Sequence, residues 1–503
     1  MIRSLLIANR GEIAVRVIRA CRELGIRSIA VFSEADQNAM HTQLADDAVA
    51  LGGSEPRASY LDIGKVVDAA VATGADAIHP GYGFLSERPE FVEACEAAGI
   101  TFIGPSAGAM RRLGSKIDAK QLAVRAGVPT APGFFEPGAS LDTLAQECLK
   151  VGFPIMLKAS AGGGGRGMRV VREAAELVPA LEQASDEALK AFGDGSMMAE
   201  RFVERPRHVE VQVIADSYGT VNCLFERDCS VQRRHQKLIE EAPSPWVAED
   251  PVRWSGLRDA SERLVREAGY VGAGTVEFMV DDATGNFYFL EVNARLQVEH
   301  PVTEAVTGID LVQDQIRVAN GERLSSFDGD RSRLRGWAIE ARIVAENPSQ
   351  NFAPSIGPIL GWAQPNHPGV RVDTGFGVGS EVSPYYDSLL AKVIASAETR
   401  DAAIRRLREA LLDFHILGVR TNIEFLLAVL GSSEFQAGTI DTGWVGREFL
   451  PRWAGCPPDL EVVGALVRQS RPVAASLRST KESTSVGAWS VGDRFRVAKE
   501  NVS

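Results

Sequence analysis

The sequence predicts an α/β protein of several domains that begins with an open parallel sheet, and three observations support this prediction. First, 503 residues correspond to about three or four domains at roughly 100 to 200 residues each. Second, 45% hydrophobic and 24% charged residues are typical of a globular chain. Third, short apolar segments alternate with segments of helical spacing from the N-terminus onward, which is the pattern of repeated βαβ units.

The N-terminal region, 1–113, shows this alternation most clearly. Residues 5–8 form a short apolar run, 12–24 have helical spacing, and 28–32 are again strand-like. The same pattern continues through expected helices at 66–73 and 90–98 and expected strands at 77–79 and 101–103. Ligand loops belong at the carboxyl ends of such strands. The first of these loops reads Asn-Arg-Gly-Glu and lacks the Gly-x-Gly-x-x-Gly of a dinucleotide site, so we expect no NAD binding.

The rest of the chain divides at changes in composition. A linker, 114–130, contains an expected helix at 116–125, and Gly and Pro residues then mark a hinge. Residues 131–203 read as a small module in the order helix, strand, glycine-rich loop, strand, helix, strand. The larger region 204–450 alternates strands and helices, and 451–503 is expected to be a linker followed by a hairpin.

Charge and cysteine usage exclude several classes of protein. Fifty-four Lys and Arg against 66 Asp and Glu give a formal charge of −12, which is the wrong sign for a nucleic-acid binding chain. The six cysteines contain no Cys-x-x-Cys pair, which favours reduced thiols over disulfides or a zinc site. The apolar start is too short for a signal peptide, and no run of about 18 apolar residues follows. We therefore expect a cytoplasmic protein with no nucleic-acid or membrane partner and no structural metal.

The glycine-rich segment 162–167 is the most conspicuous candidate for anion binding. Consecutive glycines leave backbone N–H groups free to approach an anion and allow positive φ. In a Walker A loop the lysine follows the glycines and a helix begins, whereas here Lys158 precedes them and a strand follows. We expect a hairpin lid with a lysine at its base; the alternative is a flexible surface hairpin.

Two acids, Glu277 and Glu291, lie equally far from a turn centred near Thr284. If the flanking apolar segments are strands, these carboxylates face each other across an antiparallel pair and repel. A divalent cation removes the repulsion, and two carboxylates with the amide oxygen of Asn293 suit Mg²⁺ or Mn²⁺. The alternative is a solvated hairpin whose acids point to water.

From Glu291 to Glu299, polar residues alternate strictly with apolar ones. If this segment is extended, its polar side chains share one face and Glu299 lies up to about 26 Å from Glu291. One end would then bind metal and the other carry out chemistry. A half-exposed strand is the commoner explanation of alternation alone, and the pairing with Glu277 favours function.

A basic cluster spans 227–237 and contains Arg227, Arg233, Arg234, His235 and Lys237. In an acidic protein such a cluster suits phosphate or another small anion better than a nucleic-acid backbone. The alternative is an ion-pair network with the acids at 240 and 241. His208 alternates with valines on an expected strand, where a lone histidine is usually a surface or core residue.

Together, a hinged lid with lysine and glycines, a facing Glu pair with Asn, and a basic anion site resemble an ATP-grasp enzyme. Within that superfamily the chain closely resembles biotin carboxylase over about residues 1–450. The resemblance rests on four long strings, at 7–14, 79–87, 227–237 and 295–304. It implies an N-terminal open parallel sheet preceding the ATP-grasp unit, an ATP-grasp lid and core, and a C-terminal biotin carboxylase domain.

The resemblance also implies roles for individual residues. ATP phosphates or ribose would be contacted by Lys116, Lys158, Gly164, Gly165, His208, Gln232 and His235, and the backbone from Glu200 to Val203 would hold adenine. Glu277, Glu291 and Asn293 would ligate Mg²⁺ or Mn²⁺. Bicarbonate would be held by Lys237, Arg295, Gln297 and the Val298 amide, with Glu299 as the base. Arg342 would stabilise the biotin enolate, and Tyr82 would help line the biotin pocket.

The implied reaction is ATP-dependent carboxylation of biotin through carboxyphosphate. No methionine is followed by lysine, so the Met-Lys-Met signature of a biotin carrier is absent. We therefore expect biotin on a separate biotin carboxyl carrier protein, a carboxyltransferase that passes the group to an acyl-CoA such as acetyl- or propionyl-CoA, and the homodimer usual in the family.

Two other functions stay open. The first is an ATP-grasp ligase with a different acceptor, which the string at 295–299 together with Arg342 argues against. The second is a nucleotide-binding subunit without turnover, which the presence of every implied catalytic residue argues against.

Overall fold

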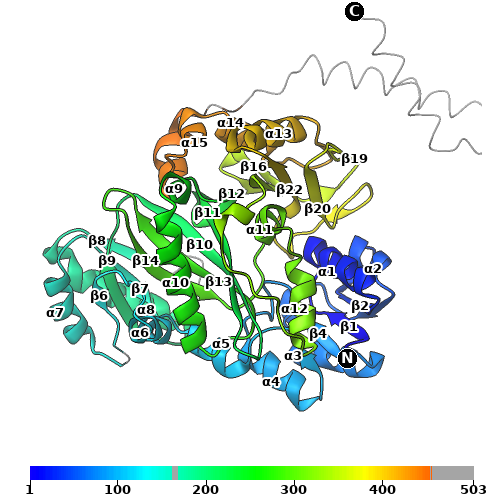
Figure 1. Cartoon of the computed structure of the whole chain (residues 1–503), viewed down its shortest axis with the longest axis horizontal. Helices are drawn as coiled ribbons and strands as arrows, with labels where there is room; N and C mark the ends of the chain where they lie inside the picture. The colour runs from blue at the N-terminus through cyan, green and yellow to red at the C-terminus, as the bar shows by residue number, and fades with distance from the viewer. Residues whose placement is uncertain (137, 161–167, 454, 456–503) are drawn as a thin grey trace, which may run out of the picture. The chain divides into compact units, whose positions relative to one another are not determined.

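The computed structural model describes residues 1–136, 138–160, 168–453 and 455. Residues Met1–Ala454 form one compact unit (Figure 1). The glycine-rich loop at 162–167 and most of the expected C-terminal segment 451–503, including its expected hairpin, are outside the described residues. Within the described part of the chain, no helix is long and apolar enough to cross a membrane.

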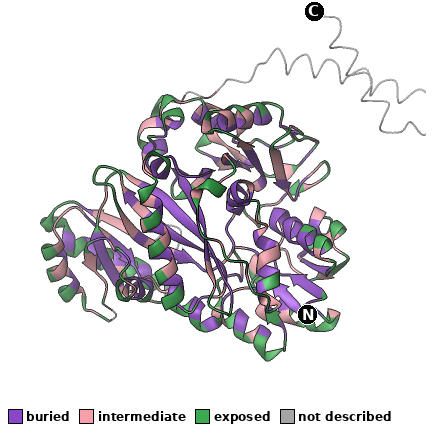
Figure 2. Cartoon of the chain, in the orientation of Figure 1, coloured by how far each residue is buried: buried purple, intermediate pink, exposed green. Residues whose placement is uncertain are grey.

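The N-terminal region forms the predicted open parallel sheet. Its strands are β1 (Ser4–Ile7), β2 (Arg27–Phe32), β3 (Asp47–Ala50), β4 (Ala77–His79) and β5 (Thr101–Phe102), in the order β3-β2-β1-β4-β5. All four ladders are parallel. The helices of this region are α1 (Gly11–Leu24), α2 (Met40–Leu44), α3 (Ile63–Thr73), α4 (Pro89–Ala97) and α5 (Ala107–Gly114). Strand β1 is buried along its whole length, as expected for the centre of a sheet covered on both faces (Figure 2).

The predicted small module is a four-stranded antiparallel sheet with helices, and we call it the lid. Helix α6 (Lys116–Arg125) leads into it. Its strands are β6 (Gly133–Phe134), β7 (Ile155–Ala159), β8 (Met168–Val171) and β9 (Met197–Arg201), and its helices are α7 (Leu141–Val151) and α8 (Leu177–Phe192). The strand order is β6-β9-β7-β8, and apolar side chains from α7, α8 and three of the strands form its own core.

The larger region is built on an eight-stranded antiparallel sheet, which places most of the polar candidates. Its order is β14-β13-β10-β11-β12-β15-β22-β20. The strands are β10 (Pro206–Ala215), β11 (Val221–Arg233), β12 (Gln236–Ala242), β13 (Gly272–Asp281), β14 (Asn286–Asn293), β15 (Trp337–Val344), β20 (Val370–Thr374) and β22 (Leu389–Ala397). The sheet runs through the middle of Figure 1 and is mostly buried (Figure 2).

Helices cover this sheet, and short strand pairs complete the C-terminal part. The helices are α9 (Pro245–Glu249), α10 (Val252–Glu267), α11 (His300–Thr307), α12 (Leu311–Ala319), α13 (Arg400–Leu412), α14 (Ile423–Leu430) and α15 (Ser433–Ala437). The short strands are β16 (Glu346–Asn347), β17 (Ala353–Pro354), β18 (Gly357–Pro358), β19 (Gly361–Ala363), β21 (Glu381–Val382) and β23 (His415–Leu417). The result is the predicted mixed α/β architecture, with parallel pairing confined to the N-terminal sheet among the described strands.

One local prediction is wrong. Strand β14 ends at Asn293, so the alternating segment does not continue as an extended strand to Glu299. Residues after Asn293 turn, and Glu299 instead precedes helix α11, with Pro301 in the first turn of that helix. Proline lacks the N–H that a sheet ladder needs but is well suited to the first turn of a helix.

Candidate functional site

A cavity of about 540 Å³ is lined by residues from the N-terminal sheet, the lid and the eight-stranded sheet. The predicted site residues that line it are Tyr82, Lys116, Lys158, His208, Gln232, His235, Lys237, Glu277, Glu291, Asn293, Arg295, Gln297, Val298, Glu299 and Arg342. These side chains come from positions more than 200 residues apart in the sequence. The fold therefore gathers the predicted cations and carboxylates into a single volume.

The lid end of the cavity carries lysines from two elements. Lys116 begins α6, and Lys158 lies on β7 before the glycine-rich segment. Glu200 on β9 is an ion-pair partner of Lys158 at 2.5 Å and of Lys120 at 2.5 Å. Although burial opposes ionisation, the two ammonium groups lower the pKa of Glu200 to about 2. Glu200 is therefore a fixed negative charge that holds both lysines at the base of the lid.

Two of the residues expected around the nucleotide do not line this cavity, and two others are outside the described residues. Val203 lines a separate cavity of about 630 Å³, together with residues of the hinge and of β13. Glu200 is not among the residues that line the main cavity and reaches it through Lys158. Gly164 and Gly165 lie outside the described residues.

The facing acid pair has the predicted register. Glu277 on β13 is paired with Glu291 on β14, next to a bulge that shifts the ladder by one residue. The Asn293 side-chain amide donates to Glu277 Oε1 at 2.9 Å. Both carboxylates line the cavity, so the hairpin acids do not simply point to solvent. Two carboxylates and an amide form an oxygen-rich donor set of the kind that hard divalent cations prefer.

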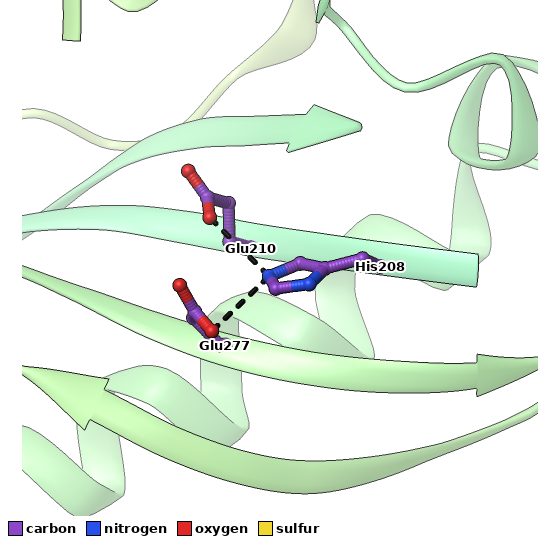
Figure 3. Close-up of side chains that lie close together, drawn as sticks. All are labelled: His208, Glu210 and Glu277. Carbon is purple, nitrogen blue, oxygen red and sulfur yellow. Dashed lines mark ion pairs between the residues drawn. The ribbon is translucent and has the colours of Figure 1, made fainter. Parts of the chain in front are cut away.

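A further acid belongs to this group. Glu210 on β10 is fully buried, and its register partner across β13 is Glu277. The His208 imidazole lies 3.5 Å from Glu210 and 3.2 Å from Glu277, between the two carboxylates (Figure 3). One ligand atom from each of these three residues falls within 4.8 Å of the others, which is a spacing that a metal ion could bridge.

Lys237 connects this acidic group to the expected catalytic end of the cavity. Its ammonium lies 2.7 Å from Glu210, 3.0 Å from Glu277 and 2.6 Å from Glu299. Although burial favours the neutral amine, the three carboxylates raise the pKa of Lys237. Lys237 contacts Glu299 and also Glu277, which is the strand partner of Glu291. The two ends of the segment 291–299 are therefore close together, not about 26 Å apart as an extended strand would place them.

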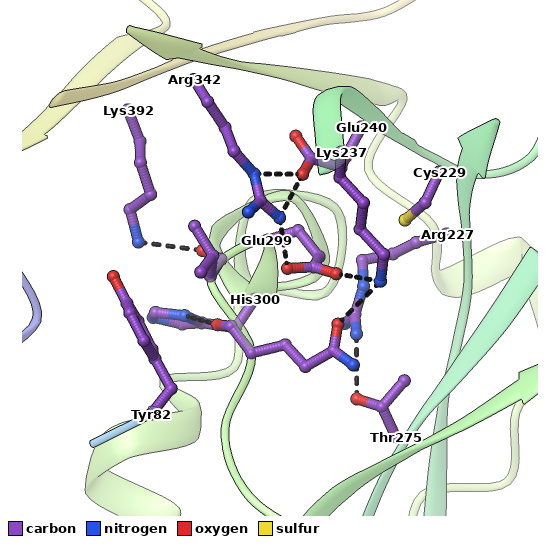
Figure 4. A network of polar contacts seen from close by, with 12 residues as sticks. Tyr82, Arg227, Cys229, Lys237, Glu240, Thr275, Glu299, His300, Arg342 and Lys392 are labelled. Carbon is purple, nitrogen blue, oxygen red and sulfur yellow. Dashed lines mark hydrogen bonds and ion pairs between the residues drawn. The ribbon is translucent and has the colours of Figure 1, made fainter. Parts of the chain in front are cut away.

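Glu299 is held between two cations. Its second carboxylate oxygen accepts from Arg342 at 2.9 Å, and its first accepts from Lys237 at 2.6 Å (Figure 4). Burial would raise its pKa, but Lys237 and Arg342 outweigh this effect and keep the pKa below its ordinary value. Glu299 is therefore ionised at neutral pH, as a residue must be before it accepts a proton.

The segment that leads to Glu299 presents further donors. Arg295 forms an ion pair with Glu87 at 3.0 Å, and its guanidinium also donates to the Asn293 side-chain oxygen at 3.0 Å. The Gln297 amide donates to Glu277 at 3.0 Å. These contacts fix the direction of side chains that would face a small anion in the cavity.

The basic cluster divides by burial. Arg227 is fully buried and donates to Glu210 at 2.5 Å, so it stabilises the charge of that carboxylate. It also donates to the Thr275 hydroxyl (Figure 4). His235 and Lys237 line the cavity, whereas Arg233 stacks over the ring of Phe352. The alternative of an ion-pair network with the neighbouring acids is wrong. Glu240 pairs with Arg342, and Glu241 pairs with Arg400 at 2.6 Å.

Sequence reasoning missed several residues of this site. Glu210 alternates with His208 on β10, so its place on the same face was available from the pattern. Lys120 follows Lys116 by one helical turn on α6, and this spacing was the available signal. Glu87 carries no comparable local signal, because its partner Arg295 is distant in the sequence.

Three family comparisons cover most of the chain. Residues 1–110 match the biotin carboxylase N-terminal domain, and residues 340–447 match the biotin carboxylase C-terminal domain. Residues 115–327 match the ATP binding domain of the carbamoyl-phosphate synthase L chain.

Curated relatives and solved structures agree with these matches. Biotin carboxylase 1 of Bacillus subtilis is 49% identical over 442 residues, which cover 88% of this chain and 98% of the relative. The α subunit of rat mitochondrial methylcrotonoyl-CoA carboxylase is 44% identical over 504 residues, covering 99% of this chain and 70% of the relative. The biotin carboxylase domain dimer of Hydrogenobacter thermophilus 2-oxoglutarate carboxylase, solved with MgADP, ADP and bicarbonate, superposes with a TM-score of 0.85 at 46% identity, covering 89% of this chain and 97% of that one.

Proposed function

The chain belongs to the biotin carboxylase family of ATP-dependent ligases, and from this premise we propose how its own residues carry out the reaction. The proposed reaction is ATP-dependent carboxylation of biotin on a separate biotin carboxyl carrier protein. Bicarbonate supplies the carboxyl group through a carboxyphosphate intermediate. The observation that carries this proposal is the position of Glu299, ionised between Lys237 and Arg342 on the wall of the cavity that the lid lysines also line.

In the proposed first step, bicarbonate lies against Lys237, Arg295, Gln297 and the Val298 amide, and Glu299 takes its proton. The freed oxygen attacks the γ-phosphorus of ATP, the bond to the β-phosphate oxygen breaks, and ADP and carboxyphosphate form. Attack of one anion on another is opposed by charge repulsion, so fixed cations must provide most of the catalysis. Lys116 and Lys158 at the lid end, with His208, Gln232 and His235, hold the nucleotide.

In the proposed second step, carboxyphosphate breaks into CO₂ and phosphate, and the phosphate takes the N1 proton of biotin. The biotin enolate then attacks CO₂ to give carboxybiotin. Arg342 stabilises the negative charge of the enolate, and Tyr82 forms part of the wall that the biotin ring contacts. The position of Arg342 supports this role, since its guanidinium lines the cavity and contacts Glu299.

Glu277, Glu291 and Asn293 are proposed to hold Mg²⁺ or Mn²⁺. The donor set fits such an ion, because two carboxylates in direct register and an amide converge on the cavity wall. When bound, the ion neutralises charge on the phosphate oxygens. In the Hydrogenobacter structure the nucleotide is accompanied by magnesium, which supports magnesium as the first choice.

The downstream acceptor is proposed to be an acyl-CoA. The rat methylcrotonoyl-CoA carboxylase subunit, 44% identical over 99% of this chain, supports an acyl-CoA acceptor. Acetyl- and propionyl-CoA are further candidate acceptors, and a carboxyltransferase is the proposed partner. The dimer of the Hydrogenobacter domain supports a homodimer. The expected cytoplasmic location stays a prediction.

The experiment that tests this proposal is bicarbonate-dependent ATP cleavage measured with and without free biotin. We expect cleavage to require bicarbonate and to be stimulated by biotin, with carboxybiotin as product. Bicarbonate-dependent cleavage that ignores biotin would point to a ligase with another acceptor. Nucleotide binding without any cleavage would point to a subunit without turnover.

A further inference from the structure

Lys392 is a buried cation that contacts the site without lining it. It lies on β22, and its side chain is fully buried. Its register partner on β15 is Arg342, so both side chains leave the same face of the sheet. A lysine ammonium has three donors and is stable in such a place only when it is paired and hydrogen-bonded. Its partners therefore indicate what it does.

The first partner is the backbone next to the proposed base. The Lys392 ammonium donates to the Val298 carbonyl oxygen at 2.9 Å. Residue 298 lies between Gln297 and Glu299, and its amide is on the proposed bicarbonate side. Because this segment is irregular after β14 ends at Asn293, no sheet ladder fixes its carbonyl groups. The ammonium supplies that missing anchor.

The second partner joins the same ammonium to the opposite wall of the cavity. Glu12 in the first turn of α1 lies 3.1 Å from Lys392. The other oxygen of Glu12 accepts from the Tyr82 hydroxyl. Figure 4 shows the Tyr82 hydroxyl and the Lys392 ammonium on the same side of the polar network. Tyr82 and Val298 both line the cavity, whereas Glu12 and Lys392 do not.

The backbones are also arranged to allow this contact. A Cβ atom added to Gly375, just after β20, would lie 2.5 Å from the carbonyl carbon of Gly11. Such a distance is too short for any side chain. The N-terminus of α1 and the C-terminal part of the large sheet therefore approach more closely than any residue but glycine allows, which brings Glu12 to Lys392.

The second acid within ion-pair distance, Asp373, does not account for Lys392. Asp373 lies 4.0 Å from the ammonium, at the limit of an ion pair, and already has a bidentate partner in Arg371 at 2.6 Å. The close contacts of Lys392 are thus Glu12 and the Val298 carbonyl. Val298 itself lines the cavity, and Glu12 accepts a hydrogen bond from Tyr82, which also lines it.

We propose that Lys392 and Glu12 are positioning residues that hold the bicarbonate segment and the biotin-facing Tyr82 in a fixed relation across the cavity. This inference rests on the proposed function, because it assigns Glu299 and the Val298 amide to bicarbonate and Tyr82 to biotin. Lys392 touches neither substrate. It acts by fixing the carbonyl of Val298 and the carboxylate that receives the Tyr82 hydroxyl.

The test compares Lys392→Met and Glu12→Gln with a matched control, Arg400→Met. Arg400 also forms an ion pair with a buried glutamate, Glu241 at 2.6 Å, but neither residue lines the main cavity. For each purified full chain, we would measure the thermal midpoint and the separate values of kcat and KM for ATP, bicarbonate and free biotin.

We expect Lys392→Met to lower kcat/KM for bicarbonate and for biotin about 100-fold, the size of effect that a misplacement of about 1 Å produces. Its KM for ATP stays within about twofold of wild type. Glu12→Gln keeps an acceptor for the Tyr82 hydroxyl, so it lowers kcat/KM for bicarbonate and for biotin only about tenfold. The double variant is no worse than Lys392→Met, because residues that act as one unit are not additive. Arg400→Met lowers the thermal midpoint but leaves the three KM values near wild type.

Several results would overturn the inference. Lys392→Met with wild-type kinetics would do so. Equal increases of the KM values for ATP, bicarbonate and biotin in Lys392→Met would also do so, as would the same decreases of kcat/KM in Arg400→Met. If Lys392→Met does not fold, Glu12→Gln decides, and wild-type kinetics in that variant overturn the inference. Failure of the proposed function is distinguishable, because it removes biotin stimulation from the wild-type protein itself.

Discussion

Glu299 shows how neighbouring charges define the state of a single residue. Lys237 and Arg342 contact one oxygen each and keep the carboxylate ionised. In the proposed first step, bicarbonate competes with Glu299 for the ammonium of Lys237. As that contact moves to the substrate, the carboxylate loses one of the charges that lowered its pKa and becomes a stronger base. In this proposal, the lysine that binds the substrate and the glutamate that activates it act on each other.

Glu299→Gln tests this role. The amide is nearly isosteric but cannot accept the bicarbonate proton, so we expect kcat to fall about 10² to 10⁴-fold, the usual contribution of a general base. The affinity for ATP, measured by equilibrium binding, stays close to wild type because Glu299 is not among the proposed nucleotide contacts. The control is Glu241→Gln, another buried glutamate on an arginine, which retains turnover. Wild-type turnover in Glu299→Gln would remove the proposed base.

At the same scale, the sequence predicted residue types better than residue contacts. The facing of Glu277 and Glu291 followed from counting outward from a turn, and the register confirms it. The partners of Lys237 and Glu240 could not be predicted in this way. They depend on which strands become neighbours in a sheet whose order, β14-β13-β10-β11-β12-β15-β22-β20, does not follow the chain.

Strand β9 and helix α6 show how elements, rather than single residues, position the lysines of the proposed nucleotide site. Glu200 on β9 receives Lys158 from the lid strand β7 and Lys120 from α6. Lys120 also donates to the Phe289 carbonyl on β14. Glu200 therefore connects the lid sheet to α6, and Lys120 connects α6 to the large sheet.

Lys120→Met tests this arrangement. Without Lys120, Glu200 would bind Lys158 alone and draw its ammonium away from a phosphate. We expect KM for ATP to rise about tenfold, which corresponds to about 1.4 kcal/mol, with KM for bicarbonate unchanged. Steady-state kinetics against each substrate measure this split. The matched control is Lys150→Met on α7, whose exposed pair with Glu147 lies outside the cavity. Equal changes in both KM values would contradict the role given to Lys120.

The elements were largely predictable because their signals are local. Helix α6 begins and ends where Lys116 and the following Gly and Pro indicated, and the parallel N-terminal sheet followed from its βαβ pattern. The failure at 294–299 has a physical cause. Alternation of polar and apolar residues is compatible with an irregular segment when both sides are covered by protein, and here the proline at 301 stops any sheet ladder.

For the whole molecule, burial of neutral histidines determines part of the response to acid. Burial lowers the pKa of His41 to about 4, from an ordinary value of 6.5. The unfolded chain therefore binds a proton that the folded chain does not, and the free energy of unfolding falls as pH drops below about 6.5 and through about 4. Glu12 has the opposite effect, because burial raises its pKa to about 7 despite Lys392.

Comparison of wild type with His41→Gln isolates one contribution to this balance. Between about pH 7.5 and pH 5, we expect the variant to lose about 2 kcal/mol less unfolding free energy than wild type, since it has no imidazole to protonate. Urea unfolding followed by circular dichroism at both pH values measures the difference. An identical pH dependence in the two proteins would show that His41 is not buried in its neutral form.

The whole account depends on transfer of an oxygen atom from bicarbonate to phosphate. If Glu299 frees bicarbonate to attack ATP, the bridging oxygen of carboxyphosphate comes from bicarbonate and stays with phosphorus when CO₂ leaves. The most direct measurement supplies bicarbonate labelled with heavy oxygen and analyses the product phosphate by mass spectrometry. The account predicts one labelled oxygen in each phosphate formed during carboxybiotin synthesis. Unlabelled phosphate would contradict it, because water or another acceptor would then have attacked ATP.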